Sequence, residues 1–525
     1  MADLSFRETL QAEQLFDPVA WWGQADGART ALVEARDGRT HSYASLNADA
    51  DTWARRLRGC GVAHGDRVAV LAQNRVEFIA LLCACIRTGA LLVPLNWRLS
   101  AAELGRVIAD AEPTVLLGED RFAAIAREAC LIAQVGVPPR WIDLDRDVNG
   151  LLQLLVDAAH SDTRSTDDPV LLLYTSGSTG TPKGVMIPHR QLLANAIATT
   201  TAWGIGQDDV GPIVTPFFHT GGWNVFTTPI LFRGGTAVLI DGFDPETFLD
   251  TVKRFGLTVS FGVPTQLAML RTSSKWGMSL PKLRWFISGG APCPERIKDD
   301  VLAAGYRFRE GYGLTECGPN CFATTDDTAS NRFGTVGWPI TFLQMRLRGD
   351  DGSLVGDDQV GELELRGPQL FAGYFRAPEK TADVMTSDGW LRTGDLASRA
   401  SDGVFTIRGR RKEMFISGGE NVFPGEVEAA LLDCTGVAEV SVIGVADARW
   451  GEVGCALVVC QSPQLDAPAL LAYARSRLAG YKVPKHVYFV AALPRLGSGK
   501  IDRRALGELT RDLLASAGSA SESPS

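Results

Sequence analysis

A loop rich in glycine, serine and threonine ends on a lysine and has the composition of a polyphosphate-binding segment. Small residues leave backbone N–H groups free to turn toward an anion, hydroxyl groups add donors, and the lysine adds a full charge. Apolar segments at 170–173 and 185–187 predict a buried strand on each side, which a flexible surface linker would not need. The loop contains Thr175, Ser176, Gly177, Ser178, Thr179, Gly180, Thr181, Pro182 and Lys183.

The loop does not have the spacing of a P-loop NTPase. That motif, GxxxxGK[ST], places a serine or threonine directly after its lysine. Here Lys183 follows Pro182 and precedes Gly184. The spacing therefore disfavours a P-loop NTPase.

A second candidate segment, Gly311-Tyr-Gly-Leu-Thr-Glu316, follows the strand-like run 306–309. The Tyr312 ring offers a flat face for a purine, and Thr315 offers a hydroxyl. The Glu316 carboxylate is a hard oxygen ligand of the kind that Mg²⁺ prefers. The alternative is a tight turn whose Thr-Glu pair caps a helix.

Two further segments carry single charged residues next to glycine. Asp395 follows Gly394 at the end of a predicted strand, where a carboxylate can accept the hydroxyl groups of a ribose. Lys500 ends the run Leu496-Gly-Ser-Gly-Lys500, and its compact charge can extend without obstruction. An ordinary turn and an exposed surface lysine are the respective alternatives.

The elements that must position these residues alternate between strand and helix for about 400 residues, which favours α/β layers with mostly parallel sheets. Beyond residue 340 the pattern becomes antiparallel, and a compact α+β pattern follows the basic stretch 408–412. We therefore expect an α/β fold with a large N-terminal domain at 1–409, which includes a β-rich section. We expect a smaller α+β domain at 410–525, with a disordered tail from about Ala515.

Composition limits the class of protein. The 525 residues carry a net charge of −9 with a pI near 5.4, so a nucleic-acid-coating protein is not expected. The 45% apolar content is that of a globular protein, and no apolar run reaches the roughly 18 residues that a membrane span requires. The first residues lack a hydrophobic signal core, and the cysteine spacing forms no zinc motif, so we expect a cytoplasmic protein.

Taken in order, these motifs resemble the adenylate-forming superfamily of acyl- and aryl-CoA synthetases, luciferases and peptide-synthetase adenylation domains. The resemblance extends from about Phe6 to Leu506 and is strongest to fatty-acid or aryl-acid CoA ligases. It implies ATP, Mg²⁺ and CoA as cofactor and co-substrates, and a small domain that rotates between two half-reactions.

The resemblance also assigns roles to individual residues. It places adenine and the nucleotide against Gly290, Ala291, Gly311, Tyr312 and Gly313, and the ribose on Asp395 and Arg410. It places the metal on Thr179 and Glu316 and the phosphates on the loop that ends at Lys183. Lys500 would bridge the α-phosphate and the substrate carboxylate, Lys412 would be the hinge, and Gly419 and Trp450 would contact CoA. Thr315 and His219 complete the catalytic set.

The substrate region is expected around Pro216-Phe-Phe-His219, which resembles the acyl-pocket gate of the family; a core histidine is the alternative. The pocket is expected to draw on residues 219–224, 261–264, 289–291 and 317–320. No acidic side chain follows His219 to hold an ammonium group, so we expect a carboxylic acid without an α-amino group.

The expected function is an acyl-CoA synthetase. It would convert a carboxylic acid and ATP to an acyl-adenylate and pyrophosphate, and then transfer the acyl group to CoA with release of AMP. A ligase that loads the phosphopantetheine of a carrier protein remains an alternative, as do a luciferase-like oxygenase and an inactive nucleotide-binding regulatory protein. A homodimer is compatible with all of these readings.

Overall fold

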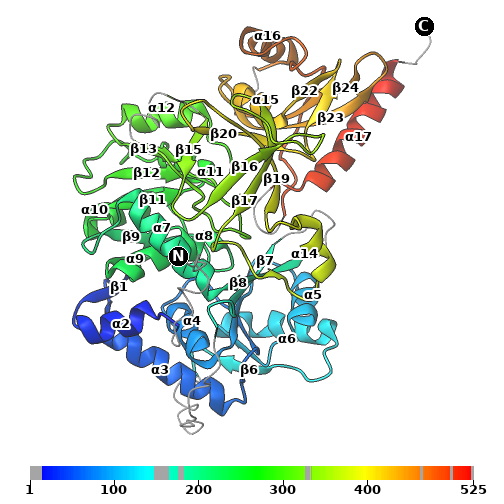
Figure 1. Ribbon diagram of the computed structural model, residues 1–525. Coiled ribbons are helices and arrows are strands. Elements are labelled where there is room, and N and C mark those ends of the chain that lie inside the picture. Colours follow the sequence, from blue (N-terminus) through cyan, green and yellow to red (C-terminus); the bar gives the residue numbers. More distant parts are fainter. Residues whose placement is uncertain are drawn as a thin grey trace, which may run out of the picture.

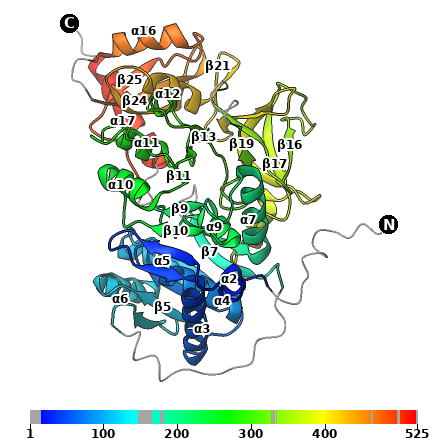
Figure 2. The same ribbon diagram turned by 90° about the vertical axis from the view of Figure 1, so that its left-hand side faces the viewer.

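The computed structural model describes residues 15–146, 165–175, 182–325, 332, 334–461, 465–496 and 501–521. The chain forms a large body in which blue, cyan and green segments lie below a smaller orange and red part (Figure 1). The same separation is visible after a quarter turn (Figure 2). Six residues of the predicted site lie outside the described ranges: Ser176, Gly177, Ser178, Thr179, Gly180 and Lys500.

A seven-stranded sheet with the order β18-β8-β7-β4-β3-β5-β6 carries the phosphate-loop segment. Its strands β7, β4, β3, β5 and β6 are parallel, whereas β8 pairs antiparallel with β7 and β18 antiparallel with β8. The strands are β3 (Arg67–Leu71), β4 (Leu91–Pro94), β5 (Val115–Gly118), β6 (Arg140–Asp143), β7 (Pro169–Thr175), β8 (Lys183–Pro188) and β18 (Gly373–Tyr374).

Two smaller sheets complete the α/β part. The four-stranded sheet has the order β2-β1-β10-β9, and the three-stranded sheet β11-β12-β13 is entirely parallel. Their strands are β1 (Thr30–Glu34), β2 (Thr40–Ser42), β9 (Val210–Ile213), β10 (Thr236–Leu239), β11 (Val259–Gly262), β12 (Trp285–Ser288) and β13 (Phe308–Glu310).

An antiparallel sheet of order β14-β15-β20-β19-β17-β16 confirms the predicted change from parallel to antiparallel strands beyond residue 340. A separate five-stranded sheet, β22-β21-β24-β23 with β25 beside β24, lies in the small domain. The strands are β14 (Phe322–Ala323), β15 (Thr335–Pro339), β16 (Gln344–Arg348), β17 (Val360–Arg366), β19 (Leu391–Arg399), β20 (Phe405–Arg410), β21 (Phe415–Ser417), β22 (Glu420–Val422), β23 (Val437–Asp447), β24 (Gly451–Cys460) and β25 (His486–Phe489).

The helices cover these sheets, and several of them begin at a residue whose side chain caps the first turn. At α5, for example, the Ser100 side chain accepts from the Glu103 backbone while the Glu103 carboxylate accepts from Ser100, a complete capping box. The helices are α2 (Pro18–Ala25), α3 (Tyr43–Gly59), α4 (Glu77–Thr88), α5 (Ala101–Ala111), the short 3₁₀ helix η1 (Asp120–Phe122), α6 (Ala123–Ala133), α7 (His189–Trp203), α8 (Thr220–Asn224), α9 (Thr227–Arg233), α10 (Pro245–Phe255), α11 (Pro264–Leu270), α12 (Glu295–Ala303), α14 (Pro378–Val384), α15 (Pro424–Leu432), α16 (Ala467–Arg477) and α17 (Arg503–Ser521).

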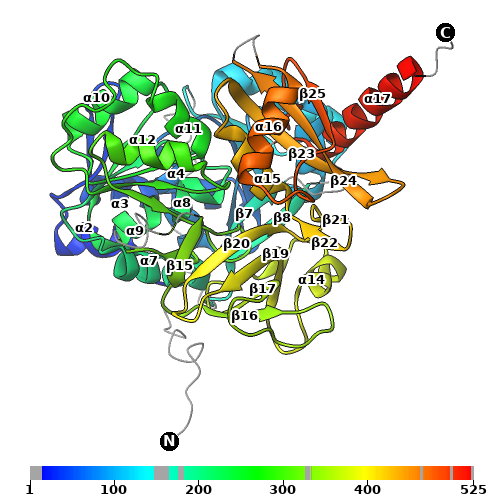
Figure 3. The ribbon, with the colours of Figure 1, turned by 90° about the horizontal axis from the view of Figure 1, so that it is seen from above.

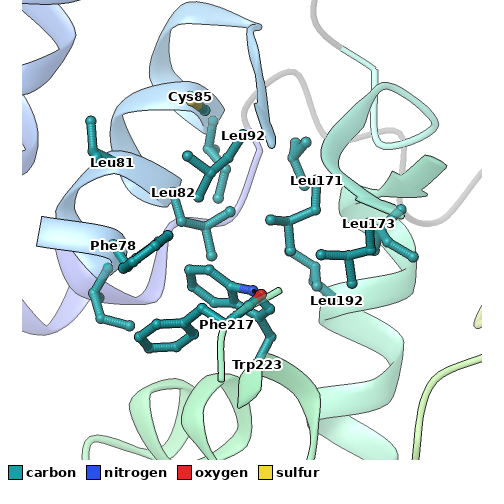
Figure 4. Packing of buried hydrophobic residues seen from close by; sticks show 14 of the residues in the cluster. Phe78, Leu81, Leu82, Cys85, Leu92, Leu171, Leu173, Leu192, Phe217 and Trp223 are labelled. Carbon is teal, nitrogen blue, oxygen red and sulfur yellow. Dashed lines mark hydrogen bonds between the residues drawn. The ribbon is translucent and has the colours of Figure 1, made fainter. Parts of the chain in front are cut away.

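The largest core cluster lies between helix α4 and strands β4 and β7, and it also receives side chains that come just before and within α8. Phe217 and Trp223 project into this cluster toward Phe78 (Figure 4), with ring centroids of Phe217 and Trp223 4.2 Å apart. The Trp223 indole N–H donates to the Phe217 carbonyl oxygen at 2.6 Å. These two aromatic side chains, which we expected to shape the substrate pocket, therefore stabilise the core.

The C-terminal segment differs from the expected disordered tail. The backbone of α17 continues from Arg503 to Ser521, past the predicted start of the tail at Ala515. Alanine has the highest helix propensity and serine an intermediate one, so an Ala/Ser segment can extend a helix that is already formed. Seen from above, α17 projects from the edge of the small domain (Figure 3). None of the helices that the structure describes is long and apolar enough to cross a lipid bilayer.

Candidate active site

Two glycine-containing loops meet at the carboxyl ends of β12 and β13. The strands are parallel neighbours, and Ser288 pairs with Glu310 at their ends. The Gly311 N–H donates to the Ser288 carbonyl oxygen at 2.8 Å, and a Cβ at Gly289 would lie 3.4 Å from the Gly311 carbonyl oxygen. Gly290 has a φ of +84°, a conformation that suits glycine. The structure thus places Ser288 and Gly289, which directly precede Gly290 and Ala291, beside Gly311.

Tyr312, Asp395 and Arg410 form one connected group. The Tyr312 hydroxyl donates to Asp395 Oδ2 at 2.5 Å, and Arg410 Nε lies 2.7 Å from Asp395 Oδ1. Asp395 and Arg410 are partners across the antiparallel pair β19–β20, so sheet register brings them together. Both oxygens of this buried carboxylate are therefore oriented before any ligand binds.

The electrostatics of this group follow from its burial. Burial raises the pKa of Asp395, while the charge of Arg410 and the Tyr312 hydrogen bond act in the opposite direction. Burial and the nearby Asp395 raise the pKa of Tyr312 well above its usual range, so its hydroxyl stays a donor. The Tyr312 ring is held edge-on against Phe322, with centroids 5.7 Å apart. A fixed aromatic ring can offer a face to a purine.

Glu316 lies in a second group, with Tyr374 and Lys183. The Tyr374 hydroxyl donates to Glu316 Oε1 at 2.8 Å, and Lys183 Nζ lies 5.0 Å from the centroid of the Tyr374 ring. Tyr374 reaches this position because β18 pairs with β8, which begins at Lys183. Burial and the charge of Glu316 raise the pKa of Tyr374 above its ordinary value.

Tyr374 is a site residue that the sequence reasoning missed. Its only local signal is a Gly-Tyr dipeptide in the run Leu-Phe-Ala-Gly-Tyr-Phe, 58 residues from Glu316. Such a dipeptide is common, and only the pairing of β18 with β8 shows which residue its hydroxyl can reach.

The two ends of the phosphate loop are also in place. Thr175 ends β7 and pairs directly with Lys183 at the start of β8. Because the strands are antiparallel neighbours, residues 176–181 must span between these two positions; those residues lie outside the described ranges. The ring of Tyr374 lies beside Lys183, and its hydroxyl donates to Glu316. Tyr374 therefore connects the base of the loop to the Glu316 carboxylate.

The residues present fit a magnesium ion that is shared with phosphate. Among the described residues, no three His, Cys, Asp or Glu side chains cluster as a metal site. The Tyr374 hydroxyl donates to one oxygen of the Glu316 carboxylate, and among the residues that the structure describes no side chain donates a hydrogen bond to the other. Mg²⁺ in nucleotide sites is held by one or two carboxylates together with phosphate oxygens. A single hard carboxylate beside Lys183 matches that donor set.

A small apolar pocket lies next to the glycine loops and includes residues that follow His219. It encloses about 210 Å³ when its open mouth is counted, and no charged side chain lines it within the part of the chain that the structure describes. Among the described residues that line it, Thr215 alone has a polar side chain. Phe261 lies in the pocket wall, whereas Phe217 and Trp223 do not. The lining residues are Pro212, Ile213, Val214, Thr215, Gly221, Gly222, Val225, Phe226 and Phe261.

Other predicted residues have separate surroundings. His219 is half-buried directly before α8, with its ring 4.6 Å from that of Phe218. The Thr315 carbonyl oxygen accepts from the Gln191 side-chain amide at 3.1 Å, so the backbone at Thr315 is held by α7.

The small domain packs Gly418, the residue before Gly419, against Trp450, whereas a Cβ at Gly419 would meet nothing within 4 Å. The Gly418 N–H donates to the Trp450 carbonyl oxygen at 2.9 Å, and a Cβ at Gly418 would lie 2.7 Å from the Trp450 ring. Trp450 is 37% exposed, and Gly419 is exposed with a φ of +89°. This places an aromatic face beside a glycine edge, an arrangement that leaves room for a slender ligand.

Comparisons with known proteins cover nearly the whole chain. A family model described as AMP-binding enzyme matches residues 19–375, and one described as AMP-binding enzyme C-terminal domain matches residues 426–500. A feruloyl-CoA synthase of an Amycolatopsis species is 38% identical over 90% of this chain and 94% of its own length. An indoleacetate–CoA ligase of Aromatoleum aromaticum is 37% identical over 90% of this chain and 93% of its own.

Solved structures show the same similarity. The o-succinylbenzoate CoA synthetase of Bacillus subtilis in complex with ATP and a magnesium ion is 29% identical, with a TM-score of 0.82 over 93% of this chain and 98% of that one. The family matches, the two curated ligases and this structure agree with the motifs and with the two-part fold. The chain therefore belongs to the AMP-binding enzyme family.

Proposed function

We propose that this protein is an acid–CoA ligase for apolar, aromatic carboxylic acids. It would join the acid to AMP with release of pyrophosphate, and then pass the acyl group to the thiol of CoA with release of AMP. The observation that carries the proposal is the pre-paired nucleotide side of the site, in which Asp395 is held by Tyr312 and Arg410.

The first step brings together two anions, so its main requirement is charge neutralisation and positioning. Tyr312 would stack on the adenine, Asp395 would accept the ribose hydroxyls, and Lys183 would face the phosphates. Lys500 would bridge the substrate carboxylate and the α-phosphate as a mobile charge. Magnesium, when bound at Glu316, would shield phosphate charge.

The second step needs no nucleophile from the protein, because the CoA thiol attacks the acyl-adenylate carbonyl and AMP leaves. The exposed Trp450 and the glycine edge at Gly419 would guide the CoA chain. His219 would line the route between pocket and thiol. In this proposal the part of the chain after Lys412 rotates about that residue between the steps.

The substrate class follows from the pocket and from the relatives together. An uncharged pocket wall gives an α-ammonium group no partner, and burying an unpaired charge is costly. Both curated relatives are named for acids that carry an aromatic ring. The side chains of Phe226 and Phe261 line the pocket, and aromatic rings pack favourably against the planar ring of an aromatic acid.

Pyrophosphate release with a panel of acids tests the proposal. Cinnamic and arylacetic acids should give the highest kcat/KM, fatty acids of increasing length should decline, and α-amino acids should give no signal. CoA-dependent formation of the thioester should accompany it. If pyrophosphate were released with an acid but the acyl group passed only to a carrier protein, the protein would instead be a carrier-loading ligase. A protein that consumed no ATP with any acid would contradict the enzyme assignment.

A size series at Gly221 links any activity to the pocket. A Cβ there would lie 3.3 Å from Thr215 Cγ2 and 4.0 Å from the Phe261 ring. Gly221→Ala should be tolerated, and Gly221→Leu should lower kcat/KM for aromatic acids about 10-fold or more with little change in the KM for ATP. Equal kinetics in both variants would place the acid elsewhere.

The remaining proposals concern context. ATP and CoA are expected from the cytoplasm, where we propose that the enzyme acts without nucleic-acid partners. A homodimer is compatible with the fold, and the mass in solution measured by light scattering would decide it.

A further inference from the structure

The residue before Lys412 is bound to the large domain. Arg411 Nη1 lies 2.7 Å from Glu362 Oε2 and Arg411 Nη2 lies 2.7 Å from Asp350 Oδ1. The Arg411 backbone N–H also donates to the Gly394 carbonyl oxygen at 2.9 Å. Glu362 and Gly394 belong to β17 and β19, and Asp350 lies in the turn that follows β16, so two contacts attach Arg411 to the antiparallel sheet and a third to its edge.

The residue after Lys412 is bound to the small domain. Glu413 Oε2 lies 3.2 Å from Arg503 Nη2, at the first residue of α17. Arg503 is itself held there, because its Nη1 donates to Ser441 Oγ at 2.9 Å and approaches Glu428 Oε1 at 3.2 Å. Glu413 is therefore tied to a polar network that spans α15, β23 and α17.

Lys412 lies between these attachments without any of its own. The residue is exposed, and within the described part of the chain its side chain makes no hydrogen bond or ion pair. Two backbone bonds cross it, because the N–H groups of Glu413 and Met414 both donate to the Arg410 carbonyl oxygen at 3.1 Å. These two bonds must open if the small domain turns, whereas the side-chain contacts on either side lie within one domain and can persist.

We propose that Arg411 and the Glu413–Arg503 pair are positioning residues that confine the domain rotation to the backbone of Lys412. The inference rests on the proposed function for the rotation itself and adds which side chains define the two rigid bodies. Without them, residues 410–414 would share the rotation, and the small domain would reach each orientation less accurately. A misplacement of about 1 Å is enough to slow a reaction substantially.

The test compares three variants that replace a charged side chain by methionine. Arg411→Met and Glu413→Met each remove one attachment, while Arg503 retains Glu428 and Ser441. Arg504→Met is the matched control, since Arg504 is the next residue on α17 and pairs only with Glu508 at 3.1 Å within its own helix. Arg411→Lys keeps the charge and serves as the conservative variant.

We expect Arg411→Met and Glu413→Met to lower kcat for thioester formation roughly 3- to 10-fold, with the KM for ATP and acid and the melting temperature close to those of the control. Arg411→Lys should recover part of the rate. Hydrogen exchange should become faster across residues 409–416 in both variants and not in Arg504→Met. Because the attachments act on one pivot, the double variant should lose less than the product of the two single losses.

Wild-type rates and exchange in both methionine variants would overturn the inference. The exchange measurement does not depend on catalysis. Suppose that the wild-type chain forms no thioester, while in the methionine variants fast hydrogen exchange still spreads from residues 413–414 to the whole 409–416 segment. The proposed function would then fail, and the assignment of the attachments would stand.

Discussion

The two halves of the candidate site differ in how far they are organised without a ligand. In the large domain, side chains already hold one another: Tyr312 and Arg410 orient Asp395, and Tyr374 orients Glu316. In the small domain, Trp450 is 37% exposed and its neighbour Gly419 is exposed as well. A preorganised half can bind nucleotide with little rearrangement, whereas an open half suits a domain that must change its orientation.

The two halves of the site also differ in their electrostatics. The large-domain half contains the buried Asp395 and the partly buried Glu310, and desolvation raises the pKa of both carboxyl groups. The small-domain half offers solvent-exposed groups. The large-domain charges that act on ATP are held in place, whereas the small-domain charges reach ATP only when that domain moves.

The strongest test of this division replaces the small-domain lysine. Lys500→Ala should lower the rate of adenylation about 10²- to 10³-fold or more, because a charge that joins two anions in the transition state is lost. A pre-made acyl-adenylate should still react with CoA at a near-normal rate. Single-turnover measurements of each half-reaction separate the two effects, and an equal loss in both would remove the division of labour.

A substitution at the predicted hinge should affect the two half-reactions unequally. Proline at Lys412 restricts φ to about −65°, so Lys412→Pro should favour one domain orientation. We expect one half-reaction to fall about 10- to 100-fold while the other changes little. Normal rates in both, measured in the same assays, would show that the rotation does not depend on this residue.

Within the preorganised half, Tyr374 can be tested by removing one oxygen. Tyr374→Phe deletes the hydroxyl that donates to Glu316 and keeps the ring near Lys183. We expect the Mg²⁺ concentration for half-maximal adenylation to rise about 3- to 10-fold, because the carboxylate loses its orientation. An unchanged magnesium dependence in Tyr374→Phe would limit the tyrosine to packing.

The smallest effect concerns stability and pH. Burial raises the pKa of Glu310 to about 7 from its usual 4.5, and its carboxylate accepts from the Cys293 N–H at 3.2 Å. Between these two pH values the folded protein holds a proton that the unfolded chain has released, so the stabilisation is fully present below pH 4.5 and is lost as pH rises through 7. The test measures the melting temperatures of the wild type and of Glu310→Gln from pH 5 to 8. As pH rises, the melting temperature of the wild type should fall by a few degrees relative to that of the variant. A difference that does not depend on pH would assign the shift to another group.

Local patterns were enough to predict much of the fold. Residues 77–88 have apolar side chains at helical spacing, which predicts a helix, and α4 has those bounds. Strand predictions at 170–174 and 284–288 fall on β7 and β12 with shifts of one residue at most. The segment 424–432 is helical as expected. In each case a continuous apolar or periodic run lies beside glycine or proline, so local preference and burial agree.

Prediction was weaker where distant segments meet. Short motifs identify Tyr312, Glu316 and Asp395 as candidate site residues. The hydrogen bond between Tyr312 and Asp395, however, joins residues 83 positions apart. The side chains of Phe217 and Trp223 were expected in the pocket and lie in the core instead, where both rings contact Phe78 and the Trp223 N–H donates to the Phe217 carbonyl oxygen. Periodicity alone does not decide which of two apolar environments an aromatic side chain enters.

Sequence by itself determined which chemical groups this protein carries, their order, and the α/β elements that precede each one, because glycine loops, caps and apolar periods act over a few residues. Only the tertiary structure decided which groups touch. Strand pairing brings Tyr374 to Glu316, sheet register sets Arg410 opposite Asp395, and domain contacts leave Lys412 between two attached neighbours. Those contacts depend on the packing of segments far apart in the chain, where a shift of one residue in register would turn a side chain to the opposite face.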